Sequence, residues 1–180
     1  IPTIDMNWIS TYGIEWAIKF TYLYTLFALP SYLPFVLKTF AMFKVFRGFF
    51  ITILHLGPPF GMIPDGFDNA LASHYLTKDL FFSGHTGYIF LSAFIFWNNK
   101  PMRFFFIIFA LFIGSTTLFM HDHYTLDVLA ALPITFTVYM VSKELFKSDW
   151  LVHRDPNYNY PPFLSWSPYK GNQVFDKNTY

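Results

Sequence analysis

Two short polar motifs, each at the edge of a long apolar run, carry the residues of this chain that could do chemistry. The first contains Ser83, Gly84 and His85, and the second contains His123 and Asp127. Ionisable groups at the ends of membrane segments are costly and usually have a function. Two imidazoles on either side of a phosphorus atom could carry out an in-line displacement, in which one attacks and the other protonates the departing oxygen.

The spacing within each motif indicates roles for its members. Ser83 stands where a helix N-cap would, and Gly84 would let a phosphate approach the open N–H groups of the following helix, so we expect both to bind substrate. His123 and Asp127 are four residues apart, so on a helix they would share a face. A carboxylate there would orient the imidazole and stabilise its cationic form. We therefore assign catalytic roles to His85, His123 and Asp127.

The composition restricts the class of protein. The 180 residues are 54% hydrophobic and only 13% charged, against about 25% charged residues in a typical soluble domain. These values indicate an integral membrane protein. The net charge of +1 and the scattered basic residues give no footprint for nucleic acid. The absence of cysteine from the sequence excludes disulfides and a thiolate nucleophile.

The apolar runs predict an all-α fold, a polytopic transmembrane bundle of about five helices. The cores of the predicted spans are residues 14–36, 40–56, 86–97, 104–120 and 124–141. Pro30 and Pro34 should end or kink the first span. Pro133 should bend the last span without breaking it, because nearby hydroxyls can satisfy the freed carbonyls.

The distribution of basic residues predicts the orientation of the bundle. The turn at 98–103 and the segment after residue 141 are rich in Lys and Arg, so the positive-inside rule places them in the cytosol or a matrix-like compartment. The two histidine motifs then share the opposite, non-cytosolic face. We expect this face in the Golgi, the endoplasmic reticulum or the plasma membrane. The alternative is the mitochondrial inner membrane, as part of a complex.

At these residues the chain resembles the sphingomyelin synthase family of the type 2 phosphatidic acid phosphatase (PAP2) superfamily. Residues 79–86 and 121–128 are similar to the third and fourth motifs of that family, and a looser similarity covers Arg47, Gly48 and residues 58–62. The resemblance implies a PAP2-like core at about 47–141 within a transmembrane domain over residues 1–147. Residues 148–180, rich in Pro, Tyr and Trp, are predicted to form a non-helical tail.

The resemblance implies a specific reaction, and we expect neither a cofactor nor a metal. That family moves phosphocholine, or a related head group, from a glycerophospholipid to the primary hydroxyl of ceramide. By resemblance, His123 would attack the phosphodiester and form a phosphohistidine, and Asp127 would orient it. His85 would protonate the leaving diacylglycerol and later deprotonate the acceptor. The expected partners are these lipids and the membrane, with other membrane-protein subunits expected to dock on the tail.

Departures from the family pattern leave alternatives open. Thr117 stands where the phosphatase branch has an Arg. We expect Arg47 to lie about 15 Å from Gly57 along its helix, and we assign it a structural or interfacial role. Five helices in place of the family's six imply that its first helix is absent or lies outside this chain. One alternative function is a lipid phosphate phosphatase, in which water accepts the phosphoryl group. The other is a non-catalytic PAP2-like scaffold or lipid-binding subunit of a larger membrane complex.

Two further readings concern residues beside the second motif. A metal site formed by His121 and His123 is disfavoured, because alternate positions of a helix point apart and zinc ligands must converge. Asp122, like Asp79, could face the ammonium of a head group or serve as a capping or surface acid. We therefore assign neither carboxylate a catalytic role.

Overall fold

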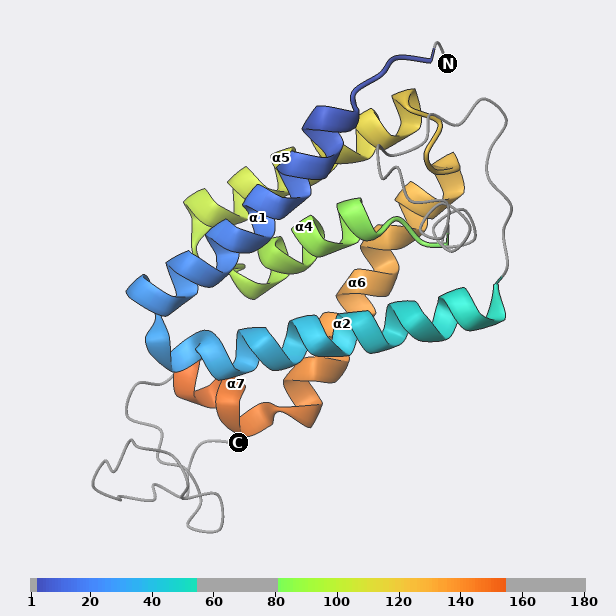
Figure 1. Cartoon of the computed structure of the whole chain (residues 1–180). Coiled ribbons are helices and arrows are strands. Elements are labelled where there is room, and N and C mark those ends of the chain that lie inside the picture. The colour runs from blue at the N-terminus through green and yellow to red at the C-terminus, as the bar shows by residue number, and fades with distance from the viewer. Residues whose placement is uncertain (1–2, 55–80, 155–180) are drawn as a thin grey trace, which may run out of the picture.

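The computed structural model describes residues 3–54 and 81–154, which are helical with no strand in those ranges. The predicted all-α class is confirmed for this part of the chain. The motif at 58–62, Asp79 and the tail beyond residue 154 lie outside the described residues. The elements in order are α1 (Asn7–Ala28), η1 (Pro30–Tyr32), α2 (Leu33–Ile53), α4 (Gly84–Ile95), α5 (Lys100–Phe119), α6 (Thr125–Leu145) and α7 (Lys147–Arg154) (Figure 1).

Two prolines separate α1 from α2. Pro30 opens the short 3₁₀ turn η1, and Pro34 lies in the first turn of α2. Proline is tolerated there because the first N–H groups of a helix have no intrahelical acceptor. The predicted interruption of the first span is thus confirmed. The helices extend beyond the predicted cores, since α1 begins at residue 7 and α2 at residue 33, and the core predicted at 14–36 runs across the break into α2.

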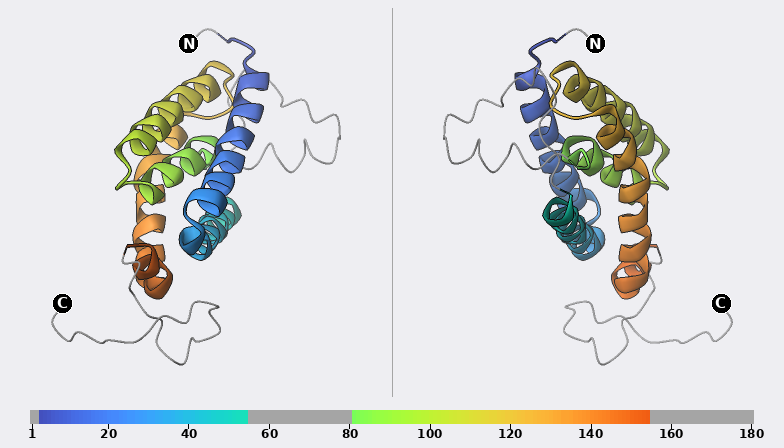
Figure 2. Two further views of the ribbon diagram at one scale, coloured as in Figure 1. Left: turned by 90° about the vertical axis from the view of Figure 1, so that its left-hand side faces the viewer. Right: turned by 90° about the vertical axis from the view of Figure 1, so that its right-hand side faces the viewer.

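The short helix α4 lies at the centre of the bundle. It packs most extensively against α5 and α6, and it also contacts α1 and α2. The side views show α1 and α6 on opposite sides of it (Figure 2). Ten of its twelve residues are buried. Its length of about 18 Å is less than the thickness of the hydrocarbon layer, about 30 Å.

Two of the described helices, α5 and α6, are long and apolar enough to cross a membrane. The predicted number of about five spans is therefore not confirmed. Helix α5 buries small and hydroxyl-bearing residues, including Gly114, Thr116 and Thr117. Five of its large apolar side chains are exposed, whereas Phe106 and Ile113 are fully buried; the exposed ones are Phe104, Phe105, Ile108, Leu111 and Phe112. Small residues at the helix contacts are typical of helices that pack on one another within lipid.

The C-terminal part of the described chain agrees with the prediction for the last span and differs from the prediction for the tail. Helix α6 continues through Pro133 as expected, and Thr137 donates a hydrogen bond of 2.9 Å to the carbonyl of Pro133. Residues 147–154, however, form α7, so the prediction of a non-helical tail from residue 148 is wrong over this stretch. The buried carboxylate of Asp149 accepts a 2.5 Å hydrogen bond from the Lys38 ammonium. This ion pair holds α7 against α2.

Gly87 allows α2 to pack closely on α4, and its replacement tests that contact. A Cβ on Gly87 would lie 2.7 Å from the ring of Phe43, which is fully buried. We expect Gly87→Ala to destabilise the bundle by about 1–3 kcal/mol through overpacking. The matched control is Gly48→Ala on α2, where a Cβ meets nothing within 4 Å and helix propensity favours alanine.

The measurement is the thermal unfolding midpoint in detergent, followed by circular dichroism. Gly87→Ala should unfold at a lower temperature than the wild type, whereas Gly48→Ala should unfold at the same or a higher temperature. Equal midpoints for the two variants would contradict this account of the α2–α4 contact.

Candidate active site

The starts of α4 and α6 are joined by a backbone hydrogen bond. The Ser83 N–H donates to the carbonyl of Asp127 over 3.1 Å. Ser83 is the N-cap of α4, and its hydroxyl accepts a hydrogen bond of 3.4 Å from the Thr86 N–H. The same hydroxyl lies 3.2 Å from the hydroxyl of Thr86. Because the Ser83 side chain is fully buried, its contribution here is to fix the start of α4 beside α6.

Asp127 has two neighbours in the first turn of α6. Its carboxylate accepts a 3.0 Å hydrogen bond from the Tyr124 N–H, an arrangement that satisfies an open donor at the helix start. The same carboxylate oxygen lies 3.9 Å from Nδ1 of His123. The two residues lie close together as expected, but not on one helix face, because His123 precedes the N-cap of α6.

A Schellman turn ends α5 and leads to the second motif. His121 has a φ of 55°, its N–H donates to the Leu118 carbonyl at 3.2 Å, and the Asp122 N–H donates to the Thr117 carbonyl at 3.0 Å. These two bonds satisfy carbonyls that the helix end leaves open. The turn brings Asp122 and His123 together to the start of α4, and both side chains are buried.

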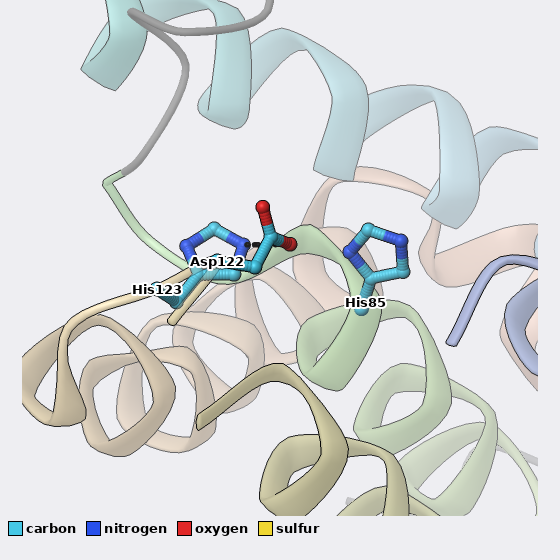
Figure 3. A group of neighbouring side chains, drawn as sticks. All are labelled: His85, Asp122 and His123. Carbon is cyan, nitrogen blue, oxygen red and sulfur yellow. Dashed lines mark ion pairs between the residues drawn. The ribbon is translucent and has the colours of Figure 1, made fainter. Parts of the chain in front are cut away.

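The two imidazoles from distant parts of the sequence face one another. The ring centroids of His85 and His123 are 6.3 Å apart, with an angle of 65° between the planes. Figure 3 shows the carboxylate of Asp122 between the two rings. Its Oδ2 lies 3.9 Å from Nε2 of His123. The structure therefore brings together His85, His123 and Asp127, and it adds Asp122, which the sequence analysis left unassigned.

The guanidinium of Arg47 lies directly against Gly84, at the start of α4. A Cβ on Gly84 would overlap it, at 2.5 Å from Cζ and 3.2 Å from Nε. The assignment of Arg47 to a structural or interfacial role, remote from the motifs, is therefore wrong in its placement. The missing side chain of Gly84 makes room for this cation beside His85, so the candidate phosphate site includes a positive charge.

The surroundings of His85 oppose its protonation. Burial, followed by the neighbouring His123 and Arg47, lowers the pKa of His85 from 6.5 to about 3. His85 lies in the first turn of α4, outside the two apolar helices α5 and α6. Its buried Nδ1 has no hydrogen-bond partner within the described part of the chain. A neutral imidazole with an available nitrogen can accept a proton or bind a metal ion.

The site thus combines a histidine beside a carboxylate, a second histidine and a guanidinium. Asp127 faces Nδ1 of His123, which leaves Nε2 as the nitrogen that could attack phosphorus. Asp122, however, lies on the Nε2 side. An incoming phosphate would have to displace this carboxylate, or a positive group between them would have to offset the repulsion.

Replacement of Gly84 tests whether Arg47 binds the anion. In Gly84→Ala the new methyl group would push the guanidinium away from the site. Because a hydrogen bond to a charged group contributes about 1.5–3 kcal/mol, we expect affinity for orthovanadate, a phosphate mimic, to fall about 10-fold or more. Titration calorimetry measures this without requiring turnover. Gly48→Ala, on the helix that carries Arg47, is the control and should bind orthovanadate like the wild type.

The Schellman turn predicts how residue 121 affects stability. At a φ of 55°, glycine is unstrained, whereas a β-branched residue costs roughly 1–2 kcal/mol. We expect His121→Gly to unfold at the same or a higher temperature than the wild type and His121→Val to unfold at a lower one. Thermal scans in detergent would contradict this if the valine variant were as stable as the glycine variant.

Comparison with known proteins gives one match. Residues 78–144 match the family described as PAP2 superfamily C-terminal, and this segment contains His85, His123 and Asp127. No curated protein and no solved structure matches the chain significantly. The match does not distinguish the sphingomyelin synthase family from other members of the superfamily. It supports the placement of this segment of the chain in the PAP2-like superfamily.

Proposed function

We propose that the chain is a membrane lipid phosphotransferase that moves a phosphorylated head group, such as phosphocholine, from a glycerophospholipid to the primary hydroxyl of ceramide. The family match supports a lipid-related phosphatase or phosphotransferase function in general. The observation that carries the proposal is the opposed pair of imidazoles, His85 and His123, with Asp127 behind one ring and Arg47 beside the other. Transfer to ceramide is our proposal within that general function.

In the first half-reaction, Nε2 of His123 attacks phosphorus. A nitrogen–phosphorus bond forms, and the bond from phosphorus to the diacylglycerol oxygen breaks. His85, on the other side of the site, gives that oxygen a proton. The anionic phosphodiester favours the protonated form of His85 and so opposes the effect of burial. Asp127 stabilises the positive charge that His123 acquires.

In the second half-reaction, the primary hydroxyl of ceramide attacks the phosphorus of the phosphohistidine. His85, now neutral, takes the hydroxyl proton, and the nitrogen–phosphorus bond breaks to restore His123. Dividing the transfer into two displacements predicts ping-pong kinetics. The same site would act as a phosphatase if water reached the intermediate, so transfer depends on exclusion of water.

The charge of the site favours a phosphodiester over a phosphomonoester. One guanidinium, that of Arg47, lies at the start of α4, while two buried carboxylates, Asp122 and Asp127, flank His123. A phosphodiester carries one negative charge, whereas a phosphomonoester carries close to two at neutral pH. The ammonium of a choline or ethanolamine head group would also be attracted to Asp122. These features support head-group transfer over hydrolysis of phosphatidic acid.

The test is a covalent-intermediate experiment with the full chain in detergent micelles. Phosphatidylcholine labelled with ³²P should leave an acid-labile label on the wild type and on His121→Asn, but none on His123→Asn. His85→Gln should slow labelling about 10²- to 10⁴-fold, the usual contribution of a general acid. His121→Asn is the matched control, because asparagine tolerates the left-handed backbone at that position.

Adding acceptors then separates the candidate products. Ceramide should convert the labelled chain into a phosphosphingolipid, and buffer alone should release label slowly. Rapid release to water, with ceramide unused, would assign the chain as a phosphatase. An unlabelled wild type, or a labelled His123→Asn, would refute the proposed intermediate.

A further inference from the structure

The side chains between the two imidazoles form a donor set that suits a metal ion. One ligand atom from each of His85, Asp122 and His123 lies within 4.8 Å of the other two (Figure 3). Two histidines and one carboxylate form a common three-ligand set for zinc, with a fourth position left for water or substrate. The expectation that histidines of the second motif would point apart concerned His121 and His123. The trio found here instead draws His85 from a different helix.

We propose that this trio binds a divalent transition-metal ion of the zinc class, and that the bound ion blocks phosphoryl transfer. The inhibitory part of the inference rests on the proposed function, whereas the metal site itself does not. Zinc bonds to nitrogen and oxygen are about 2.0–2.2 Å long, so the three donors would move closer together around the ion.

The surroundings of His123 also suit metal binding. Its Nε2 lies near Asp122, and its Nδ1 lies 3.9 Å from Asp127. Histidines that bind metals usually direct their second nitrogen to a carboxylate, which fixes the tautomer and raises the basicity of the ligand nitrogen. Asp127 is placed for that role. In addition, Nδ1 of His85 has no competing hydrogen bond within residues 3–54 and 81–154.

Charge explains why a cation suits this site. The Asp122 carboxylate is buried and lies 3.9 Å from Nε2 of His123, the nitrogen proposed to attack phosphorus. A divalent cation there would offset both buried carboxylates, Asp122 and Asp127. Once bound, the ion would occupy the lone pairs of His85 and His123. Those lone pairs are needed for attack on phosphorus and for proton transfer, so metal binding and catalysis would exclude one another.

The test of the site uses Co²⁺ as a spectroscopic probe on the full chain in micelles, after chelator treatment. The wild type and His121→Asn should each bind one Co²⁺ per chain, with visible absorption bands of nitrogen and oxygen coordination. Asp122→Asn, which preserves side-chain shape, should weaken binding at least 10-fold, and His85→Gln should do the same. Circular dichroism checks that each variant is folded. If Asp122→Asn is unfolded, the Co²⁺ affinity of His85→Gln tests the site instead. Equal Co²⁺ affinity in wild type and variants would overturn the metal site.

The test of inhibition compares two titrations with Zn²⁺. Zn²⁺ should displace Co²⁺ and reduce labelling by [³²P]phosphatidylcholine with the same midpoint, and a chelator should restore labelling. Undiminished labelling at saturating Zn²⁺ would overturn the inhibitory role. Absence of labelling at every metal concentration, with Co²⁺ binding intact, would instead refute the proposed function and leave the metal site standing.

Discussion

The hydrogen bond from the Ser83 N–H to the Asp127 carbonyl fixes the geometry on which the rest of the site depends. It places the first turns of α4 and α6 side by side, so His85 and Asp127 approach one point from two helices. The carboxylate of Asp127 has two contacts there. It accepts a hydrogen bond from the Tyr124 N–H at the helix start, and it also faces His123. A carboxylate held by the backbone is a more rigid support for a histidine than one on a free side chain.

The position of this junction follows from the unusual placement of α4. A helix of twelve residues with ten buried cannot reach both surfaces of a membrane, so it ends inside the bundle and can present its N-terminus to an internal site. The surrounding helices pack on it through buried aromatic side chains such as Phe43 of α2 as well as through small residues such as Gly114 of α5, while other large apolar side chains of α5 and α6 are exposed. For the lipid phosphotransfer proposed above, such an apolar exterior would let the substrates approach from the bilayer rather than from water.

Sequence alone predicted the all-α class, the interruption at Pro30 and the approach of His85 to His123, because proline sterics and helix-end chemistry are local. The positions of Arg47 and Asp122 in the site depend on tertiary packing, which the sequence pattern does not reveal. Distance along α2 put Arg47 far from the motifs, whereas Gly84 and Gly87, three residues apart on α4, form the groove in which Arg47 and Phe43 lie. Asp122 enters the site because the chain turns at His121, which sequence periodicity does not reveal. The roles assigned to these residues stay predictions.

Because His121 adopts a left-handed conformation, the length of the α5–α6 connection determines where Asp122 and His123 lie. Neighbouring residues in a regular helix or strand diverge, yet Asp122 and His123 both reach one small volume. The connection contains no spare residue. The N–H groups of His121 and Asp122 bond to carbonyls at the end of α5, and Tyr124 is already the N-cap of α6. Removing or adding one residue here would turn His123 away from His85 while both helices survived, so the proposed transfer reaction would be lost without loss of the fold.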